Sequence, residues 1–287
     1  MTLLDLHLGR PVHRGALTLF PIWNSAAVPA RGYDLRTPLL SVEERAGSAV
    51  VDERAGSPVV GELVVRNAGA RPALLLEGEL LEGGQQHRVA ARSVLVGAGE
   101  SLVLDVRCVE QGRWSGSSAH GRHGHRAPVS VRAAADQGAV WHEVDRYEQR
   151  YGGGATRSLL DVTRRVRPVP VDDLRPLPFQ SGVLVGLAGQ PLLLEAYDSP
   201  RTLAHAWTSL LRAVAVDAAG LAPVATPGRR ARRFVERLGS MPLAGSPAGA
   251  ATGVTGRTPY ARLDALLWRD RVVHAVAVNP LHELVAA

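Results

Sequence analysis

Two short segments concentrate side chains that can do chemistry. The first holds two carboxylates, Glu77 and Glu79, on either side of Gly78, and it ends at Arg88. Alternation along one strand, Ala73–Glu82, places both carboxylates on the face opposite the core, about 7 Å apart at Cα. Two carboxylates can divide the acid and base roles at a glycosidic bond, and an arginine can clamp a phosphate. The alternative is a solvated strand face with its charges paired across the sheet.

The second segment, Cys108–Trp114, carries five functional side chains in seven residues. It follows a predicted strand, and strand ends are common places for binding groups. Glu110 supplies an acid, Arg113 an anion-binding fork and Trp114 a stacking surface. Their alternative role is a salt bridge with a tryptophan lying over the core. Cys108 falls on the apolar face of the strand, which favours a buried cysteine over a nucleophile.

A histidine-rich stretch lies within Ser115–Arg126, which is expected to be a loop. Imidazoles at the offsets of His120, His123 and His125 can bind zinc or nickel. No cysteine or carboxylate in the same loop completes a ligand set, so a solvated loop is favoured. We therefore expect no metal site and no cofactor.

The composition excludes several chemistries. All 33 basic residues are arginine, because the chain has no lysine. Schiff-base chemistry, pyridoxal phosphate attachment and Walker A phosphate binding all need a lysine. The patterns G-x-S-x-G, H-E-x-x-H and G-x-G-x-x-G are absent as well, so hydrolase-elbow, zincin and Rossmann sites lack support.

The net charge of +6 comes from arginines that are mostly scattered along the chain. Scattered guanidinium groups favour an anionic small molecule, such as a nucleotide or phosphosugar, over nucleic acid. The one dense run, Arg229–Arg233, precedes Phe234 and predicts the solvated start of a short amphipathic helix. With no long apolar run, no visible secretory signal and a single cysteine, we expect a cytoplasmic protein that does not enter a membrane.

The N-terminal half is predicted to be β-rich. An early strand at 16–23 contains Pro21, which favours a sheet edge. The segment ERAGS occurs at Glu44–Ser48 and again at Glu53–Ser57, which we interpret as two turns of similar sequence. Four further strands, separated by glycine-rich turns, predict an antiparallel meander or sandwich. These strands are Val59–Arg66, Ala73–Leu81, His87–Val96 and Ser101–Val109.

The second half is predicted to mix helices and strands. A bridging helix from Pro128 to Tyr151 is followed by a short helix near Arg157–Val166. Strands at Val183–Leu187 and Pro191–Ala196 precede a helix that Ser199 caps. A glycine-rich segment, Ala244–Gly256, is expected to be a loop, and Tyr260–Val278 a hairpin that contains a buried His274. The predicted class is α+β, with a β-rich part over residues 1–127 and a helix plus α/β part over 128–287.

The first two segments together resemble the ARPP family, named for its association with ADP-ribosylglycohydrolases and the rhodanese-phosphatase superfamily. The resemblance covers residues 16–144 best, and the heptad Cys108–Trp114 is its most specific part. His87 and Gln85 depart from the family pattern, which commonly has asparagine and lysine there. The matching segments are Gly78–Arg88, Ser93–Val96, Cys108–Trp114 and Gln137–Trp141.

The resemblance implies a role around ADP-ribose, NAD or a related nucleotide in a bacterial conflict or stress system. We expect binding or hydrolytic processing of such a nucleotide, with Glu79 and Glu110 as catalytic residues. The expected ligand-binding residues are Gln86, Arg88, Gln111, Arg113 and Trp114. Further candidates are Glu77, Glu82, Cys108, Gln137 and Trp141.

The alternative is a non-catalytic scaffold or partner-binding module whose charged motif is structural. The two hypotheses differ in geometry: Glu79, Arg88, Glu110 and Arg113 either converge on one open pocket or pair off beneath the surface. The sequence leaves open whether the chain is an enzyme, and it defines neither the reaction nor the oligomeric state.

Overall fold

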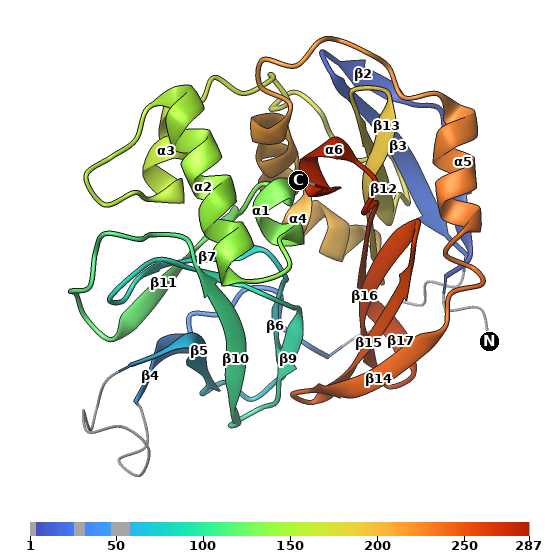
Figure 1. Ribbon diagram of the computed structural model, residues 1–287. Helices are drawn as coiled ribbons and strands as arrows, with labels where there is room; N and C mark the ends of the chain where they lie inside the picture. Colours follow the sequence, from blue (N-terminus) through green and yellow to red (C-terminus); the bar gives the residue numbers. More distant parts are fainter. Residues whose placement is uncertain (1–3, 26–31, 47–57, 287) are drawn as a thin grey trace. The chain divides into compact units, whose positions relative to one another are not determined.

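The computed structural model describes residues 4–25, 32–46 and 58–286 and divides the chain into two compact units (Figure 1). Unit 1 comprises Met1–Arg31, Pro128–Ala133 and Arg167–Ala287, and unit 2 comprises Gly32–Ala127 and Ala134–Val166. The N-terminal strands thus belong with the C-terminal half, so a boundary at residue 127 separates the units only in part. The α+β class is confirmed, with antiparallel pairing between the strands of the described sheets.

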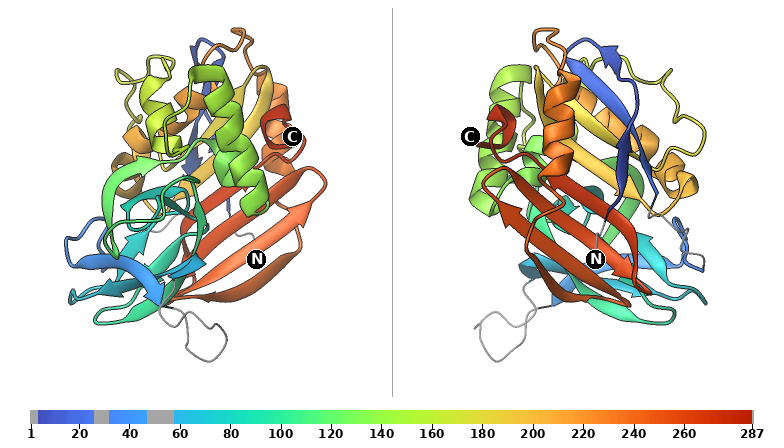
Figure 2. Two further views of the ribbon diagram at one scale, coloured as in Figure 1. Left: turned by 60° about the vertical axis from the view of Figure 1, so that its left-hand side comes forward. Right: turned by 90° about the vertical axis from the view of Figure 1, so that its right-hand side faces the viewer.

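Unit 1 is built on a nine-stranded antiparallel sheet, within the residues that are described. Figures 1 and 2 show its last four strands, coloured orange to red, side by side. The strand order is β1-β3-β12-β13-β17-β16-β15-β14, and β2 pairs with β3. The strands are β1 Leu6–Leu8, β2 Val12–Arg14, β3 Leu17–Asn24, β12 Gly182–Leu187, β13 Gln190–Tyr197, β14 Leu243–Ala248, β15 Ala251–Thr258, β16 Ala261–Trp268 and β17 Arg271–Val278.

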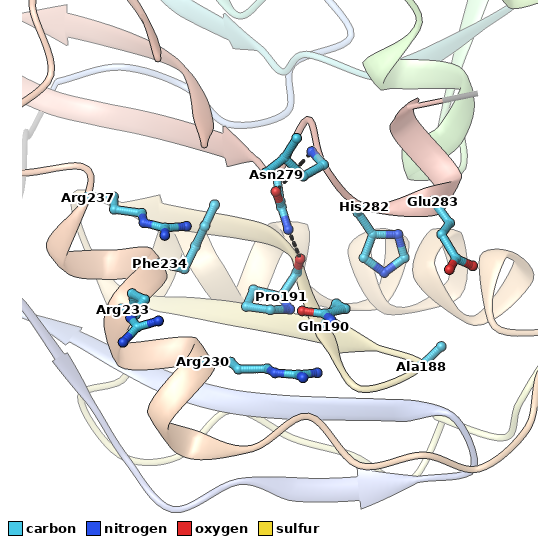
Figure 3. A pocket seen from close by; sticks show the side chains of 11 residues that line it. Ala188, Gln190, Pro191, Arg230, Arg233, Phe234, Arg237, Asn279, His282 and Glu283 are labelled. Carbon is cyan, nitrogen blue, oxygen red and sulfur yellow. Dashed lines mark hydrogen bonds between the residues drawn. The ribbon is translucent and has the colours of Figure 1, made fainter. Parts of the chain in front are cut away.

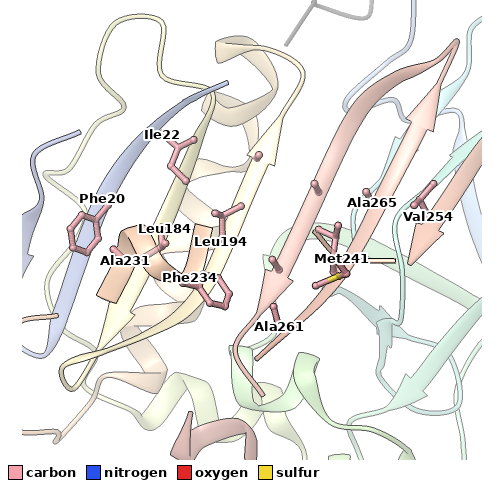
Figure 4. Packing of buried hydrophobic residues seen from close by; sticks show 14 residues of the cluster. Phe20, Ile22, Leu184, Leu194, Ala231, Phe234, Met241, Val254, Ala261 and Ala265 are labelled. Carbon is pink, nitrogen blue, oxygen red and sulfur yellow. The ribbon is translucent and has the colours of Figure 1, made fainter. Parts of the chain in front are cut away.

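Helices cover both faces of the central strands of this sheet. Ala231 and Phe234 of one helix join a core cluster with Leu184 and Leu194 (Figure 4). The next residue, Glu195, points to the opposite face, where it pairs with Arg132. The helices of unit 1 are α1 Val129–Ala133, α4 Pro200–Asp217, α5 Gly228–Glu236 and α6 Glu283–Ala286.

Over its described residues, unit 2 is a six-stranded sheet that closes on itself, in the order β10-β5-β4-β11-β7-β8. Its interior contains apolar side chains such as Leu63, Leu81 and Leu104, each fully buried. A two-stranded sheet and two helices accompany it. The elements are β4 Leu40–Ala46, β5 Pro58–Asn67, β6 Ala73–Leu75, β7 Glu79–Gly83, β8 Arg88–Ala90, β9 Val94–Val96, β10 Ser101–Cys108, β11 Ala119–Arg126, α2 Gln137–Tyr151 and α3 Leu159–Arg165.

The strand that was expected to carry both Glu77 and Glu79 on one face is interrupted by a turn. Gly78 has a φ of +77°, a conformation that favours glycine, and its amide donates to Ala90 O. The chain therefore forms β6 before the turn and β7 after it, and the prediction of one shared strand face is wrong. The predicted strand His87–Val96 is likewise divided into two short strands, β8 and β9.

Two segments expected to be loops form strands instead. Residues 119–126 form β11, which pairs with both β4 and β7, and residues 243–258 form the hairpin of β14 and β15. Pairing of their backbone groups with neighbouring strands outweighs the weak strand preference of glycine, serine and alanine. The second ERAGS copy and the end of the first lie outside the described residues.

The predicted bridging helix is also two helices. Asp136 accepts a hydrogen bond from the Ala139 amide and begins α2, whereas α1 ends at Ala133. The strand containing Pro21 is confirmed, but it is not an edge: β12 lies on one side of β3 and β1 and β2 on the other. Pro21 lies opposite the break between β1 and β2, where its missing N–H is not required.

Several predicted elements are confirmed. Ser199 caps α4 and accepts a hydrogen bond from the Thr202 amide, with Pro200 in the first turn. Strand β10 buries Leu104 and Cys108 and leaves Asp105 exposed, as the alternation predicts. Among the helices that the structure describes, none has the length and apolar content needed to cross a lipid bilayer.

Candidate functional site

The centre of the heptad Cys108–Trp114 is an ion pair between Glu110 and Arg113. Arg113 Nη2 lies 2.7 Å from Glu110 Oε2, and Nε lies 3.1 Å from both carboxylate oxygens. Glu110 also accepts a hydrogen bond from the His87 amide at 3.0 Å and is almost fully buried. Burial by itself raises the pKa of Glu110, but the hydrogen bonds from Arg113 and the His87 amide outweigh it and lower the pKa. The side chain is therefore a carboxylate at neutral pH.

The remaining N–H groups of Arg113 are used to hold the backbone. Nη1 donates to Gly84 O at 2.7 Å and to Ser115 O at 2.8 Å, and Nη2 donates to Gly83 O at 3.1 Å. With Glu110, these acceptors account for all five guanidinium N–H groups. Gly84 has a φ of +57°, and a Cβ at this position would collide with the His120 ring. Arg113 thus fastens the glycine turn after β7 to the segment that follows β10.

A second, fully buried group lies around Arg88, which is 1% exposed. Arg88 Nη1 donates to Gln86 Oε1 at 3.1 Å, and the Cys108 thiol donates to the same oxygen at 3.0 Å. Glu44 lies 3.9 Å from Arg88 Nη2, and its other oxygen lies 3.1 Å from His120 Nε2. These contacts hold Arg88 between two acceptors in the interior of unit 2.

Burial decides the protonation of the groups beside Arg88. It raises the pKa of the Cys108 thiol to about 11, against a smaller lowering effect of the Arg88 charge. It also lowers the pKa of His120, although Glu44 acts in the opposite direction. At neutral pH, Cys108 is therefore a thiol that donates a hydrogen bond, and it is a poor nucleophile.

Gln137, from the last matching segment, joins α2 to β10. Its Oε1 accepts from the Cys108 amide at 2.7 Å, and its Nε2 donates to Cys108 O at 2.8 Å. The side chain thus pairs with the backbone as a neighbouring strand does. Trp141, one turn further along α2, is partly buried.

The three acids of the first segment each contact a basic residue of β11, two of them an arginine and one a histidine. Glu79 accepts from Arg122 Nε at 2.7 Å and from Nη2 at 3.0 Å. The Glu77 carboxylate lies 3.4 Å from Arg126 Nη2, and Glu82 lies 2.9 Å from the exposed His125. The two glutamate–arginine contacts are charge pairing across the sheet, the alternative that the sequence left open. The partners were missed because β11 was expected to be a loop.

The predicted site residues therefore form separate pairs. We use the name motif network for Gln86, Arg88, Cys108, Glu110 and Arg113 with their partners Glu44, His87 and His120. Glu79 lies outside this network, because it pairs with Arg122. In the described part of the chain, no three histidine, cysteine, aspartate or glutamate residues lie close enough to hold a metal ion.

Two predicted ligand-binding residues of the heptad lie outside the motif network. Trp114 is 58% exposed, and Gln111 is partly exposed. Gln111 O accepts a hydrogen bond from Gln86 Nε2 at 3.3 Å. The assignment of both residues as ligand-binding stays a prediction, and Trp114 has the accessible ring that stacking requires.

Unit 1 contains a cavity that the sequence analysis missed. It has a volume of about 480 Å³ and is lined by Arg230 and Arg233 of α5 and by its C-cap residue Arg237, with Gln190, Asn279 and Glu283 among the residues around it (Figure 3). We call it the α5 pocket. The dense arginine run was the available signal, and its prediction as an amphipathic helix is confirmed. The sequence did not indicate that the start of β13 and the end of β17 lie beside this helix and border a cavity with it.

A family model matches residues 5–278, which is most of the chain, and its description is "ARG and Rhodanese-Phosphatase-superfamily-associated Protein domain". No curated protein and no solved structure matches the chain. The match includes the motif network and the arginines of the α5 pocket, whereas Asn279, His282 and Glu283 of the pocket lie beyond its end. The description associates the family with ARG and the rhodanese-phosphatase superfamily and names no reaction. The chain belongs to the ARPP-1 family.

Proposed function

We propose that this protein is a non-catalytic binding module for an ADP-ribose-type nucleotide, in which the motif network maintains the fold of unit 2. The nucleotide part is supported by the family's association with ARG, the ADP-ribosylglycohydrolases. The non-catalytic part is carried by one observation, the Glu110–Arg113 ion pair.

The protonation of Glu110 argues against acid catalysis. A glycosidic general acid must be protonated near neutral pH, and enzymes achieve this by raising its pKa. In this protein Arg113 and the His87 amide lower the pKa of Glu110. Glu79, the second candidate, accepts two hydrogen bonds from Arg122 and is almost fully buried. Glu110 is therefore better suited to holding an arginine than to donating a proton, and Glu79 is held in its own pair with Arg122.

Neither motif arginine is placed to clamp a phosphate. A phosphate clamp requires guanidinium N–H groups that point toward the ligand. All five N–H groups of Arg113 have protein acceptors, so phosphate binding there would require these hydrogen bonds to break. Arg88 Nε has no hydrogen-bond partner among the described residues, but the side chain is 1% exposed and lies in the interior of unit 2, where a ligand has no access to it.

The proposal is tested with wild-type protein, Arg113→Ala, Glu110→Gln and the control Arg164→Ala. The Arg164 side chain is 69% exposed and lies 3.5 Å from the partly exposed Asp161 on the surface of unit 2. Chromatography measures turnover of ADP-ribose and NAD, calorimetry measures binding, and thermal melting measures stability. We expect ADP-ribose binding by the wild type, no turnover, and a melting temperature several degrees lower for Arg113→Ala but nearly unchanged for Arg164→Ala.

Two results would overturn the proposal. The first is turnover by the wild type that is lost in Glu110→Gln while this variant still melts cooperatively. Such a result would assign catalysis to the motif network. Absence of binding heat with millimolar ADP-ribose would remove the nucleotide part. Binding that Arg113→Ala retains below its melting temperature supports a structural role for Arg113.

A further inference from the structure

Helix α5 presents its arginines in a defined direction, because its other face is fixed. Ala231 and Phe234 are buried in the core cluster of the sheet. Arg230, Arg233 and the C-cap residue Arg237, whose backbone is still helical, stand at positions i, i+3 and i+7. They therefore lie along one side of the helix over about 10 Å. Burial of the apolar face thus directs three guanidinium groups to the α5 pocket.

The surroundings of these arginines differ from those of the motif arginines. Arg230 Nη1 donates to Gly189 O at 2.7 Å, and the Arg237 guanidinium lies 4.0 Å from the centre of the Tyr260 ring. Within the described residues, no carboxylate lies at ion-pair distance from either of them or from the exposed Arg233. The carbonyl and the ring orient the outer two arginines without neutralising them.

The opposite side of the pocket carries different chemistry. Figure 3 shows Glu283 and His282 on the side away from Arg233 and Arg237. His282 Nε2 lies 3.1 Å from Leu187 O, its Nδ1 accepts from the Leu284 amide, and burial lowers its pKa, so the ring is neutral. Three guanidinium charges and one carboxylate therefore leave a net charge of +2 around the cavity.

We infer that the α5 pocket binds a sugar diphosphate or nucleoside diphosphate, with the diphosphate on the arginines and the sugar hydroxyls on Glu283. Arginine forks match phosphate oxygens, and a carboxylate accepts hydrogen bonds from a ribose diol. A volume of about 480 Å³ lies in the range of small-molecule sites. The nucleoside part of this inference rests on the proposed function, whereas the diphosphate part rests on the pocket alone.

A nucleic acid backbone fits the pocket less well. Surfaces that bind single strands combine arginines with exposed aromatic rings. Phe234, the aromatic residue of the pocket lining, is 2% exposed because it packs into the sheet core. The exposed ring of Tyr260 lies nearby, but Arg237 already covers one of its faces. The arginines also line a cavity with a carboxylate on its other side, which would repel a continuing phosphate chain.

The test measures binding of pyrophosphate and of ADP-ribose by calorimetry to wild type, Arg233→Ala, Arg232→Ala and Glu283→Gln. Arg232 is the matched control, because it is exposed on the same helix but lines a different cavity. We expect Arg233→Ala to weaken both ligands about tenfold or more, and Arg232→Ala to change neither by more than about twofold. Glu283→Gln should weaken ADP-ribose and leave pyrophosphate equal or tighter.

The outcomes separate this inference from the proposed function. Equal ADP-ribose binding by wild type and Arg233→Ala overturns the inference and leaves the proposed function intact. If the protein binds pyrophosphate but not ADP-ribose, the pocket is an anion site. That result overturns the nucleoside part of the inference and the proposed function with it. A third result would overturn the assignment to a small ligand. In that result the protein binds a single-stranded oligonucleotide, Arg233→Ala abolishes the binding, and pyrophosphate does not displace the oligonucleotide.

Discussion

The motif network of unit 2 and the α5 pocket of unit 1 both depend on arginines, yet the surroundings of these arginines are opposite. Arg113 uses every N–H group on protein acceptors and neutralises Glu110. Arg233 is exposed beside a cavity, with no carboxylate partner among the described residues. A buried guanidinium must be paired because its desolvation is costly, whereas an exposed one keeps its charge for a ligand.

The sequence indicated the heptad as the ligand site, whereas this contrast favours the arginines of α5. The heptad Cys108–Trp114 has the denser chemistry and the more specific resemblance, but its charged groups satisfy one another. The run Arg229–Arg233 offers arginine as its only functional side chain, but it borders a cavity. Density of functional residues therefore indicates a polar network, and only the surroundings show whether that network is available to a ligand.

The largest expected effect is the loss of the Glu110–Arg113 pair. Glu110→Ala leaves the Arg113 charge and the His87 amide without their acceptor, so the free energy of unfolding should fall by about 3–5 kcal/mol. Urea denaturation measures the change. The control Glu236→Ala, on the exposed face of α5, should change stability by less than about 0.5 kcal/mol. If the two variants lower the free energy of unfolding equally, the motif network is no more tightly paired than the exposed face of α5.

The reactivity of Cys108 tests whether the motif network is closed. A pKa of about 11 in place of 9.0 leaves about one hundredth of the thiolate, and burial slows access further. We expect labelling by a disulfide reagent at pH 8 to be about 100-fold slower or more in native protein than in urea. Glu110→Ala should speed the labelling. Fast labelling of the native wild type would contradict a buried Cys108.

Acid should weaken the Glu110–Arg113 pair in a defined range. The folded pKa of Glu110 lies below 4.5, so the unfolded state takes up its proton first as the pH falls. The stability that the pair contributes is fully present above pH 4.5 and declines as the pH falls toward the folded value. The measurement is the difference in unfolding free energy between wild type and Glu110→Gln from pH 7 to pH 3. A difference that stays constant over this range would be inconsistent with a lowered pKa.

The smallest effect comes from giving Arg233 a partner. Arg229→Glu places a carboxylate four residues before Arg233 and in the first turn of α5, which has no acidic residue. Helix pairing and the helix dipole should together raise the free energy of unfolding by about 0.5–1 kcal/mol. The same variant should weaken pyrophosphate binding, measured by calorimetry. Greater stability with unchanged binding would show that Arg233 does not hold the ligand.

Local patterns were sufficient for some of the elements. The serine-proline pair at 199–200 predicted the start of α4, and the alternation along 101–109 predicted which side of β10 is buried. The arginine run predicted an amphipathic α5. Each of these signals lies within one element, where side-chain periodicity and capping are decided by neighbouring residues.

Pairing partners could not be predicted in the same way. Glu44 and Arg122 lie in strands that contact the predicted site residues, but 41 residues separate Glu44 from Gln85 and 43 separate Arg122 from Glu79. The strand β11 has a glycine- and histidine-rich sequence that favours a loop, and the neighbouring strands β4 and β7 hold it in the sheet. Tertiary pairing overrides local preference where neighbouring strands satisfy the backbone.

By itself, the sequence determined the α+β class, the capped and alternating elements, the exclusion of lysine chemistry and the family. Only the tertiary structure decided which charges are neutralised and which remain available for a ligand. The physical reason is that the free energy of a charged side chain depends on its solvent exposure and on partners distant in the chain, and a linear sequence specifies neither.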